Sequence, residues 1–164
     1  MATNRDDHDG KPTDRIDDID LNILKILQAD GRTALSEIAR RLDMGTATIH
    51  ERTKSLEEEG YIREYRAMLD PELLDINEVA FLQVCTEAGR FSEVAERLAE
   101  HSAIQEIHEI TGDADLLLKV RVRDKTGLTD LLTEIGRFDG VQSTETSVAL
   151  RSVKEESKLD LNDR

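Results

Sequence analysis

Two short apolar stripes separated by a turn, within residues 33–62, constrain the fold of this chain more than any other feature. Apolar residues recur at helical spacing before the turn and restart in a second helical phase after it. The first stripe is Leu35, Ile38, Ala39 and Leu42, and the second is Ile49, Thr53 and Leu56. The turn between them, Asp43-Met44-Gly45, contains a glycine. This pattern predicts a helix-turn-helix, which can place its second helix in the major groove of DNA.

The second helix carries side chains suited to a DNA groove on the face opposite its apolar stripe. At about 100° per residue, that face shows Thr46, Ala47, His50, Glu51 and Lys54, with Arg52 at its edge. Small and hydroxyl side chains let the backbone approach bases, and Arg and Lys reach guanine edges or phosphates. The expected DNA contacts are Thr46, Thr48, His50, Arg52 and Lys54, with Arg40 and Arg41 on phosphates. The alternative is an amphipathic helix pair within an ordinary helical bundle.

The net charge of −14 opposes DNA binding and requires an explanation. Residues 31–56 differ from the rest, because five basic residues stand there against three acidic ones, a local net charge of +2. Arg exceeds Lys by 15 to 7 and aromatic residues make up only 3% of the chain. That balance is typical of a halophilic protein, kept soluble in concentrated salt by surface carboxylates. Such salt weakens the counterion release that drives DNA association, so shape, hydrogen bonds and bridging cations would matter more. The alternative is a mesophilic acidic protein that avoids nucleic acid.

Composition also excludes several classes of protein. No apolar run approaches the roughly 18 residues needed to cross a bilayer, and the polar N-terminus lacks the apolar stretch of a secretory signal. A cytoplasmic protein without a membrane partner is therefore expected. The single cysteine, Cys85, excludes an internal disulfide and lies in an apolar run that predicts burial. We find no phosphate-binding loop, catalytic triad order or metal-ligand spacing. Neither catalytic residues nor a metal or cofactor is predicted, and the chain is not expected to be an enzyme.

Segments on both sides of the helix pair complete a winged helix-turn-helix. The preceding helix has Asp17 or Asp18 as a plausible N-cap and Gly31 as its C-terminal cap. Residues 61–69 alternate in polarity as one or two short strands would. Three helices followed by a strand pair are the winged form of the motif.

The second half of the chain predicts strand, helix, strand, strand, helix and strand. These segments are 78–87, 91–101, 104–111, 115–122, 125–138 and 141–150. Their order is the ferredoxin-like βαββαβ arrangement, in which two helices cover one face of a four-stranded sheet. The other face is expected to be bare and apolar, so it needs a partner. The expected fold is thus α+β with two domains. Residues 15–67 form the winged helix-turn-helix, and residues 78–151 form the ferredoxin-like effector-binding and oligomerisation domain. Residues 68–77 are a linker, residues 1–14 are a disordered tail, and residues 152–164 are a charged tail that is a short helix or disordered.

Three segments in this order resemble the Lrp/AsnC family, the leucine-responsive or feast-or-famine transcription regulators of bacteria and archaea. Residues 16–32 are similar to the family's opening helix with its terminal Asp30-Gly31-Arg32. Residues 48–62 are similar to the recognition helix and its exit into the wing, and residues 111–120 to a Gly-Asp-aromatic-Asp turn and the following strand. The resemblance covers Ile16 to Lys154, and with the composition it favours a halophilic archaeal source.

The resemblance implies an effector site. In the family, small effectors, usually amino acids, bind between neighbouring sheet domains near the turn of the third segment. The implied residues are Gly112, Asp113 and Asp115, with Ser147 and Val148 nearby on the last strand. A turn carboxylate can pair with an α-ammonium group, and free backbone N–H groups can receive an α-carboxylate. Ala114 replaces the family's aromatic residue, which enlarges or flattens the expected pocket wall. The alternative is that the two aspartates only shape a β-turn.

The resemblance also implies the partners of the chain. They are double-stranded DNA, an amino acid or related small molecule, and further copies of the chain, as a homodimer that can join into a tetramer or octamer. The rival class is an amino-acid-sensing module whose helix-turn-helix docks a protein instead of DNA.

Overall fold

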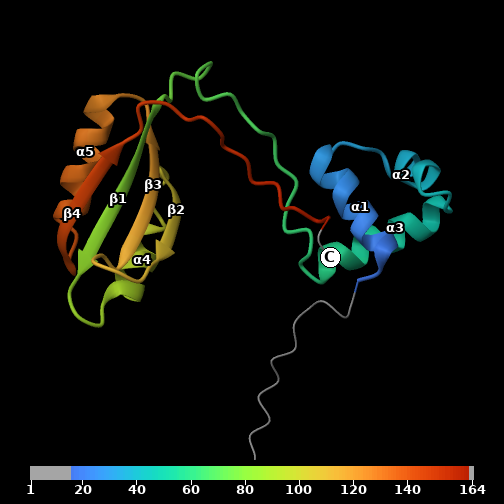
Figure 1. The fold of residues 1–164 in the computed structure, drawn as a ribbon, viewed down its shortest axis with the longest axis horizontal. Coiled ribbons are helices and arrows are strands. Elements are labelled where there is room, and N and C mark those ends of the chain that lie inside the picture. Colours follow the sequence, from blue (N-terminus) through green and yellow to red (C-terminus); the bar gives the residue numbers. More distant parts are fainter. Residues whose placement is uncertain (1–15, 163–164) are drawn as a thin grey trace, which may run out of the picture. The chain divides into compact units, whose positions relative to one another are not determined.

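The computed structural model describes residues 16–162, which fall into two compact units whose elements are labelled in Figure 1. The first unit comprises residues 16–68 together with 156–162, and the second comprises Leu69–Glu155. The expectation of a disordered tail over residues 1–14 lies outside the described residues. Within residues 16–162, no helix is long and apolar enough to cross a membrane.

The first helix, α1 (Asp18–Ala29), begins at a capping box. The Asp17 side chain accepts hydrogen bonds from two backbone N–H groups of the first turn, and the Asp20 carboxylate accepts one from the Asp17 N–H. Of the two predicted N-cap candidates, Asp17 is the cap and Asp18 is the first residue of the helix. Gly31 is not the C-terminal cap, because extended Asp30 ends the helix and donates its own N–H back to the last turn.

The next two helices, α2 (Leu35–Arg41) and α3 (Thr46–Glu58), confirm the helix-turn-helix. In the turn between them Asp43 has a φ of 51°, a left-handed conformation that Asp tolerates better than most residues. Gly45 is extended and serves as the N-cap of α3. The three helices bury one apolar core, which consists of Ile23, Leu27, Ile38, Ala39, Ile49 and Leu56.

The expected wing strands are absent from the described chain. Tyr61 and Ile62 are half-buried against the helical core, whereas residues 63–69 are exposed and belong to neither helix nor strand. The prediction of one or two strands over residues 61–69 is wrong for this single chain. A strand requires a second strand for its ladder hydrogen bonds, and no described part of the chain supplies one here.

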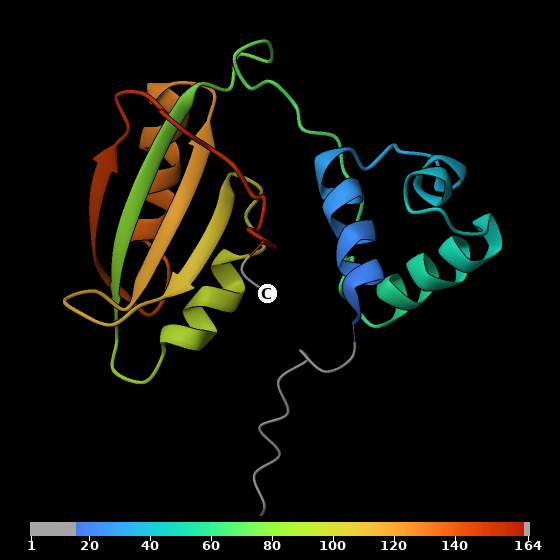
Figure 2. The ribbon, with the colours of Figure 1, turned by 45° about the vertical axis from the view of Figure 1, so that its right-hand side comes forward.

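The second unit has the predicted βαββαβ order. Its elements are β1 (Glu78–Thr86), α4 (Phe91–Leu98), β2 (Ile104–Glu109), β3 (Leu116–Val122), α5 (Lys125–Gly136) and β4 (Val141–Val148). The strands pair antiparallel in the order β2-β3-β1-β4, so β1 and β3 run side by side through the middle of the sheet (Figure 2). The apolar core includes Leu82 and Leu118 from the sheet, Val94 from α4, and Leu131 and Ile135 from α5.

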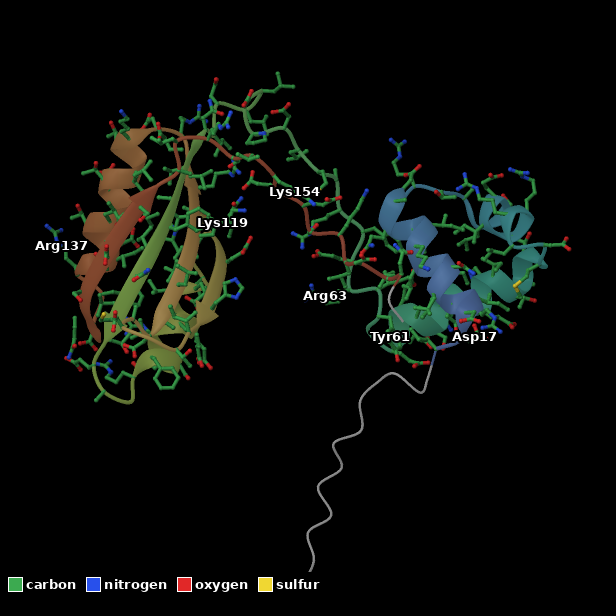
Figure 3. All side chains as sticks on the ribbon, in the orientation of Figure 1. Asp17, Tyr61, Arg63, Lys119, Arg137 and Lys154 are labelled. Atoms are coloured by element: carbon green, nitrogen blue, oxygen red, sulfur yellow. The ribbon has the colours of Figure 1, made fainter. Side chains whose placement is uncertain are left out.

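The face of the sheet opposite this core is less apolar than expected, and we call it the open face. Phe81 is 41% exposed there, and its partner across β1 and β3 is Lys119 (labelled in Figure 3). Strand alternation places Leu117 and Arg121 on the same face as Lys119. The edge strand β4 adds only polar side chains to it, namely Ser143, Glu145 and Ser147.

The segment after β4 crosses the open face (Figure 2). Its Glu155 carboxylate lies 2.8 Å from the Lys119 Nζ and also pairs with Arg121. Further along, in the first unit, the Gln28 side chain donates to the Leu159 carbonyl at 2.8 Å and accepts from the Leu159 N–H at 2.9 Å. Residues 151–162 contain no helix, which removes the short helix from the two alternatives expected for the tail.

Candidate DNA-binding and effector sites

Helix α3 turns a polar row outward and an apolar row inward. Ile49, Thr53 and Leu56 are buried, as the periodicity predicted. On the opposite side the exposed residues are Thr46, Ala47, Thr48, His50, Glu51 and Lys54. Sequence periodicity thus located the face of this helix that is free to meet a ligand.

Arg52 is turned away from that outward row. Its Nη1 atom lies 2.8 Å from Asp17 Oδ2 and 2.9 Å from Asp20 Oδ1, and only 30% of its side chain is exposed. The hydrogen bonds to Asp20 and Asp17 raise the pKa of Arg52. Because both aspartates belong to the capping box at the start of α1 (Asp17 is labelled in Figure 3), the ion pair joins α3 to α1.

The two arginines at the end of α2 share one carboxylate. Glu37 accepts hydrogen bonds from Arg40 Nε at 2.8 Å and Nη2 at 2.7 Å, and from Arg41 Nε at 2.8 Å. These bonds, that from Arg40 foremost, lower the pKa of Glu37 to about 2. Both arginine side chains stay more than half exposed, at 74% and 51%. They can therefore still meet a phosphate.

The Asp115 carboxylate in the predicted effector turn has an internal partner. Its Oδ2 atom accepts from the Thr86 N–H at 2.7 Å and from the Thr86 hydroxyl at 2.9 Å. The Asp115 N–H also donates to the Val84 carbonyl, so this residue ties the end of β1 to the start of β3. Gly112, with a φ of 132°, supplies a conformation that other residues rarely adopt.

A cavity of about 250 Å³ lies beside this turn. It is lined by Phe91, Glu109, Ile110, Thr111 and Asp115. Ala114 is 7% exposed and is not among the lining residues. Sequence reasoning missed Phe91 and Glu109, because only the sheet order brings the start of α4 beside the end of β2.

The structure does not bring all five expected effector residues together within one chain. The turn adjoins the Thr86 end of β1, whereas Ser147 and Val148 pair with Phe81 and Ala80 toward its other end. At about 3.3 Å per residue, these two groups cannot line one small pocket of a single chain.

A second cavity, of about 310 Å³, lies between the C-terminal ends of α4 and α5. The Arg97 guanidinium stacks 4.5 Å from the centroid of the Phe138 ring in its wall. Nδ1 of His101 accepts the Ala103 N–H at 3.1 Å, so the proton sits on Nε2, which faces Glu134 at 3.5 Å. Among residues 16–162, no three His, Cys, Asp or Glu side chains are grouped so that they could hold a metal ion.

Comparison with known proteins matches both units. A family model described as winged helix-turn-helix DNA-binding covers residues 16–63, and one described as the Lrp/AsnC ligand binding domain covers residues 79–159. The HTH-type transcriptional regulator FL11 of Pyrococcus horikoshii is 40% identical over 146 residues, which are 89% of this chain and 97% of that protein. The leucine-responsive regulatory protein of Escherichia coli K12 is 35% identical over 161 residues, 94% of this chain and 96% of that protein.

Solved structures agree with these matches. Escherichia coli AsnC has a TM-score of 0.81 at 27% identity, covering 87% of this chain and 97% of that chain. A Neisseria meningitidis transcriptional regulator in complex with L-Met has a TM-score of 0.82 at 26% identity, covering 90% of this chain and 98% of that chain.

The fold, the outward face of α3 and the relatives together define the class of protein. It is a transcription regulator that combines a DNA-binding helix-turn-helix with a ligand-binding sheet domain. This class of protein is not enzymatic. The chain belongs to the Lrp/AsnC family.

Proposed function

We propose that α3 reads the major groove of a specific double-stranded DNA site, and that α2 anchors it on the backbone. The observation that carries this proposal is the fully polar or small outward row of α3 opposite a buried apolar row. Thr46, Thr48, His50 and Lys54 supply short and long hydrogen-bonding groups for base edges. Arg40 and Arg41, exposed at the end of α2, meet phosphates.

Arg52 has a different role in this proposal. Because its guanidinium is held by Asp17 and Asp20, it positions α3 on α1 and does not itself read a base. Recognition then depends on Lys54 as the long cationic group of the outward row, although Lys54 also lies 3.2 Å from Glu58.

Fluorescence anisotropy tests this assignment. A labelled duplex from directly upstream of the coding sequence is compared with a shuffled duplex of the same base composition. Lys54→Ala should weaken binding by about 1–3 kcal/mol on the specific duplex alone if Lys54 contacts a base. Equal losses on both duplexes would instead make Lys54 a phosphate contact. Wild-type binding that is equally tight to both duplexes would contradict sequence-specific recognition.

We further propose that the cavity beside the turn binds an amino acid. Glu109 and the remaining oxygen of Asp115 can meet an α-ammonium group, and Phe91 and Ile110 offer apolar surface to a side chain. A relative solved with L-Met supports this class of ligand. The volume of about 250 Å³ is sufficient for a free amino acid. Coupling to DNA binding of this kind is typically about 5- to 150-fold in affinity.

Calorimetry with each of the twenty amino acids tests the site. Glu109→Gln should weaken binding at least about tenfold, because a charged hydrogen-bond partner is lost. His101→Ala, in the cavity between α4 and α5, should leave binding unchanged. If His101→Ala weakened amino-acid binding and Glu109→Gln did not, the binding site would be the cavity between α4 and α5. No binding to the wild type at millimolar concentration would contradict the effector proposal.

A homodimer completes the proposal. The open face leaves Phe81 41% exposed, which favours a second copy as its cover. A two-fold dimer presents two recognition helices to a palindromic site, and dimers can join into tetramers or octamers. Phe81→Asp should lower the mass measured by light scattering, whereas Leu73→Asp, at an 82% exposed linker leucine, should not. A wild-type mass of 18.5 kDa throughout the micromolar range would exclude assembly.

A further inference from the structure

Every cationic side chain of α2 and α3 is paired with a carboxylate of its own unit. Arg40 and Arg41 share Glu37, Arg52 lies between Asp17 and Asp20, and Lys54 pairs with Glu58. The positive charge of these two helices is therefore compensated within the fold.

Glu37 is the member of this set best placed to oppose a phosphate. It is the single acidic residue of α2, and its two oxygens accept three hydrogen bonds from the two arginines that we assign to the DNA backbone. A phosphate that binds Arg40 through Nε and Nη2, or Arg41 through Nε, needs the N–H donors that Glu37 occupies. Glu37 and phosphate thus compete for one set of donors.

We propose that Glu37 is a built-in counter-ion, which DNA phosphate displaces from Arg40 and Arg41 when the protein binds. This inference rests on the proposed phosphate contacts of the two arginines. Binding exchanges an intramolecular ion pair for an intermolecular one, and the carboxylate that is left behind is screened by cations from solution. These cations offset part of the release from DNA at this contact.

The consequence is a shallower salt dependence than the number of phosphate contacts would give. Each neutralised phosphate ordinarily adds about −0.9 to the slope of log affinity against log salt. With one carboxylate serving two arginines, Glu37 should remove at most about one such contact from the slope. A regulator with this device loses less DNA affinity as salt rises. The depressed pKa of Glu37, about 2, keeps its carboxylate charged at neutral pH.

The test measures the salt slope of the full-length protein between about 0.1 and 1 M KCl, by anisotropy on the upstream and shuffled duplexes. At the low end Glu37→Gln should bind up to about eightfold tighter than wild type, and at the high end the two affinities should converge. Its slope of log affinity against log salt should therefore be steeper by up to about 0.9. Asp18→Asn is the matched control, since Asp18 is an exposed carboxylate of the same unit outside these ion pairs. The salt slope of Asp18→Asn should equal that of the wild type.

Parallel slopes for wild type and Glu37→Gln would overturn the counter-ion proposal and leave Glu37 as a helix-stabilising residue only. A slope change of equal size in Asp18→Asn would also overturn it, because net charge alone would then explain the effect. Circular dichroism and thermal melting of each variant show that the helices remain folded. Failure of sequence-specific recognition is distinguishable, because wild type would then bind the two duplexes equally, while the slopes remain measurable on both.

Discussion

The carboxylate of Glu155, in the segment after β4, lies 2.8 Å from the ammonium group of Lys119 in the middle of β3. Arg121, two residues further along the same strand, pairs with the same carboxylate. The side chains of Lys119 and Arg121 are only 18% and 12% exposed. A single carboxylate from the C-terminal segment therefore compensates two poorly hydrated cations on the open face of the sheet.

Acid should release this segment from the sheet. The hydrogen bond from Lys119 is the largest influence that lowers the pKa of Glu155 below its ordinary 4.5. A depressed folded-state pKa means that the stabilisation is complete above about pH 4.5 and is lost as pH falls below that value. Nuclear magnetic resonance can follow the release through the backbone amide signals of residues 151–155. These signals should move to the values of a disordered chain in this acid range.

The companion variant separates Glu155 from general acid unfolding. With Glu155→Gln, the amide signals of residues 151–155 should already have the values of a disordered chain at pH 7, while far-ultraviolet circular dichroism remains that of the folded protein. Identical signals with and without Glu155 at pH 7 would show that this ion pair does not hold the segment.

Loss of Arg52 should weaken folding more than base recognition. Arg52→Gln removes the ion pair that joins α3 to α1, and we expect a fall in melting temperature of about 2–5 °C. Lys54→Ala, at an exposed site in the same helix, should leave the melting temperature within about 1 °C. If Arg52→Gln left the melting temperature unchanged and lowered affinity for the upstream duplex alone, Arg52 would contact a base.

This pair of residues shows where sequence reasoning succeeds and where it ends. A helical projection places Lys54 outward and Ile49 inward, because both depend on a period that the sequence displays. Arg52 lies at the edge of that projection, and its partner Asp20 is 32 positions earlier in the chain. Helical periodicity carries no information about contacts at that separation.

The same reasoning accounts for the remaining differences. Residues 61–69 have the alternation of a strand, but alternation does not supply a partner strand. The order of elements in the sheet unit was predictable from periodicity and turn residues. The cavity beside the effector turn was not, since only the order of elements in the sheet unit brings Phe91 at the start of α4 and Glu109 at the end of β2 to one cavity.

The Thr53 hydroxyl offers a route to a more stable helix-turn-helix. Thr53 is 4% exposed, and its Oγ1 atom is buried without a hydrogen-bond partner in the described structure. Thr53→Val keeps the shape and removes the buried polar group, so the free energy of unfolding should rise by about 1 kcal/mol. The exposed Thr48→Val is the matched control and should change it by less than about 0.5 kcal/mol. Destabilisation by Thr53→Val in urea titrations would indicate that the hydroxyl has a partner.

Asp115 should matter for stability whether or not it binds an effector. Asp115→Ala leaves the Thr86 N–H and hydroxyl without their acceptor and should cost about 1–3 kcal/mol of unfolding free energy. Thr86→Val removes only the hydroxyl bond and should cost about 1 kcal/mol. Because Thr86→Val retains the Asp115 carboxylate, it should also retain effector binding in calorimetry. Loss of binding in Thr86→Val with an unchanged melt would mean that Thr86 contacts the ligand directly.

Added salt should stabilise this protein over a range in which an ordinary regulator releases its DNA. The chain has 36 acidic against 22 basic side chains, and the resulting self-repulsion is strongest when little salt screens it. The melting temperature should therefore rise between about 0.2 and 2 M KCl, most steeply at the low end, where screening changes fastest. Sucrose at matched osmolality is the control, since it is excluded from the surface without screening charge. An equal rise of the melting temperature in sucrose would show that exclusion from the surface, not charge screening, causes the effect. A melting temperature that is flat or falls with KCl would contradict the halophilic interpretation but not the fold or the family.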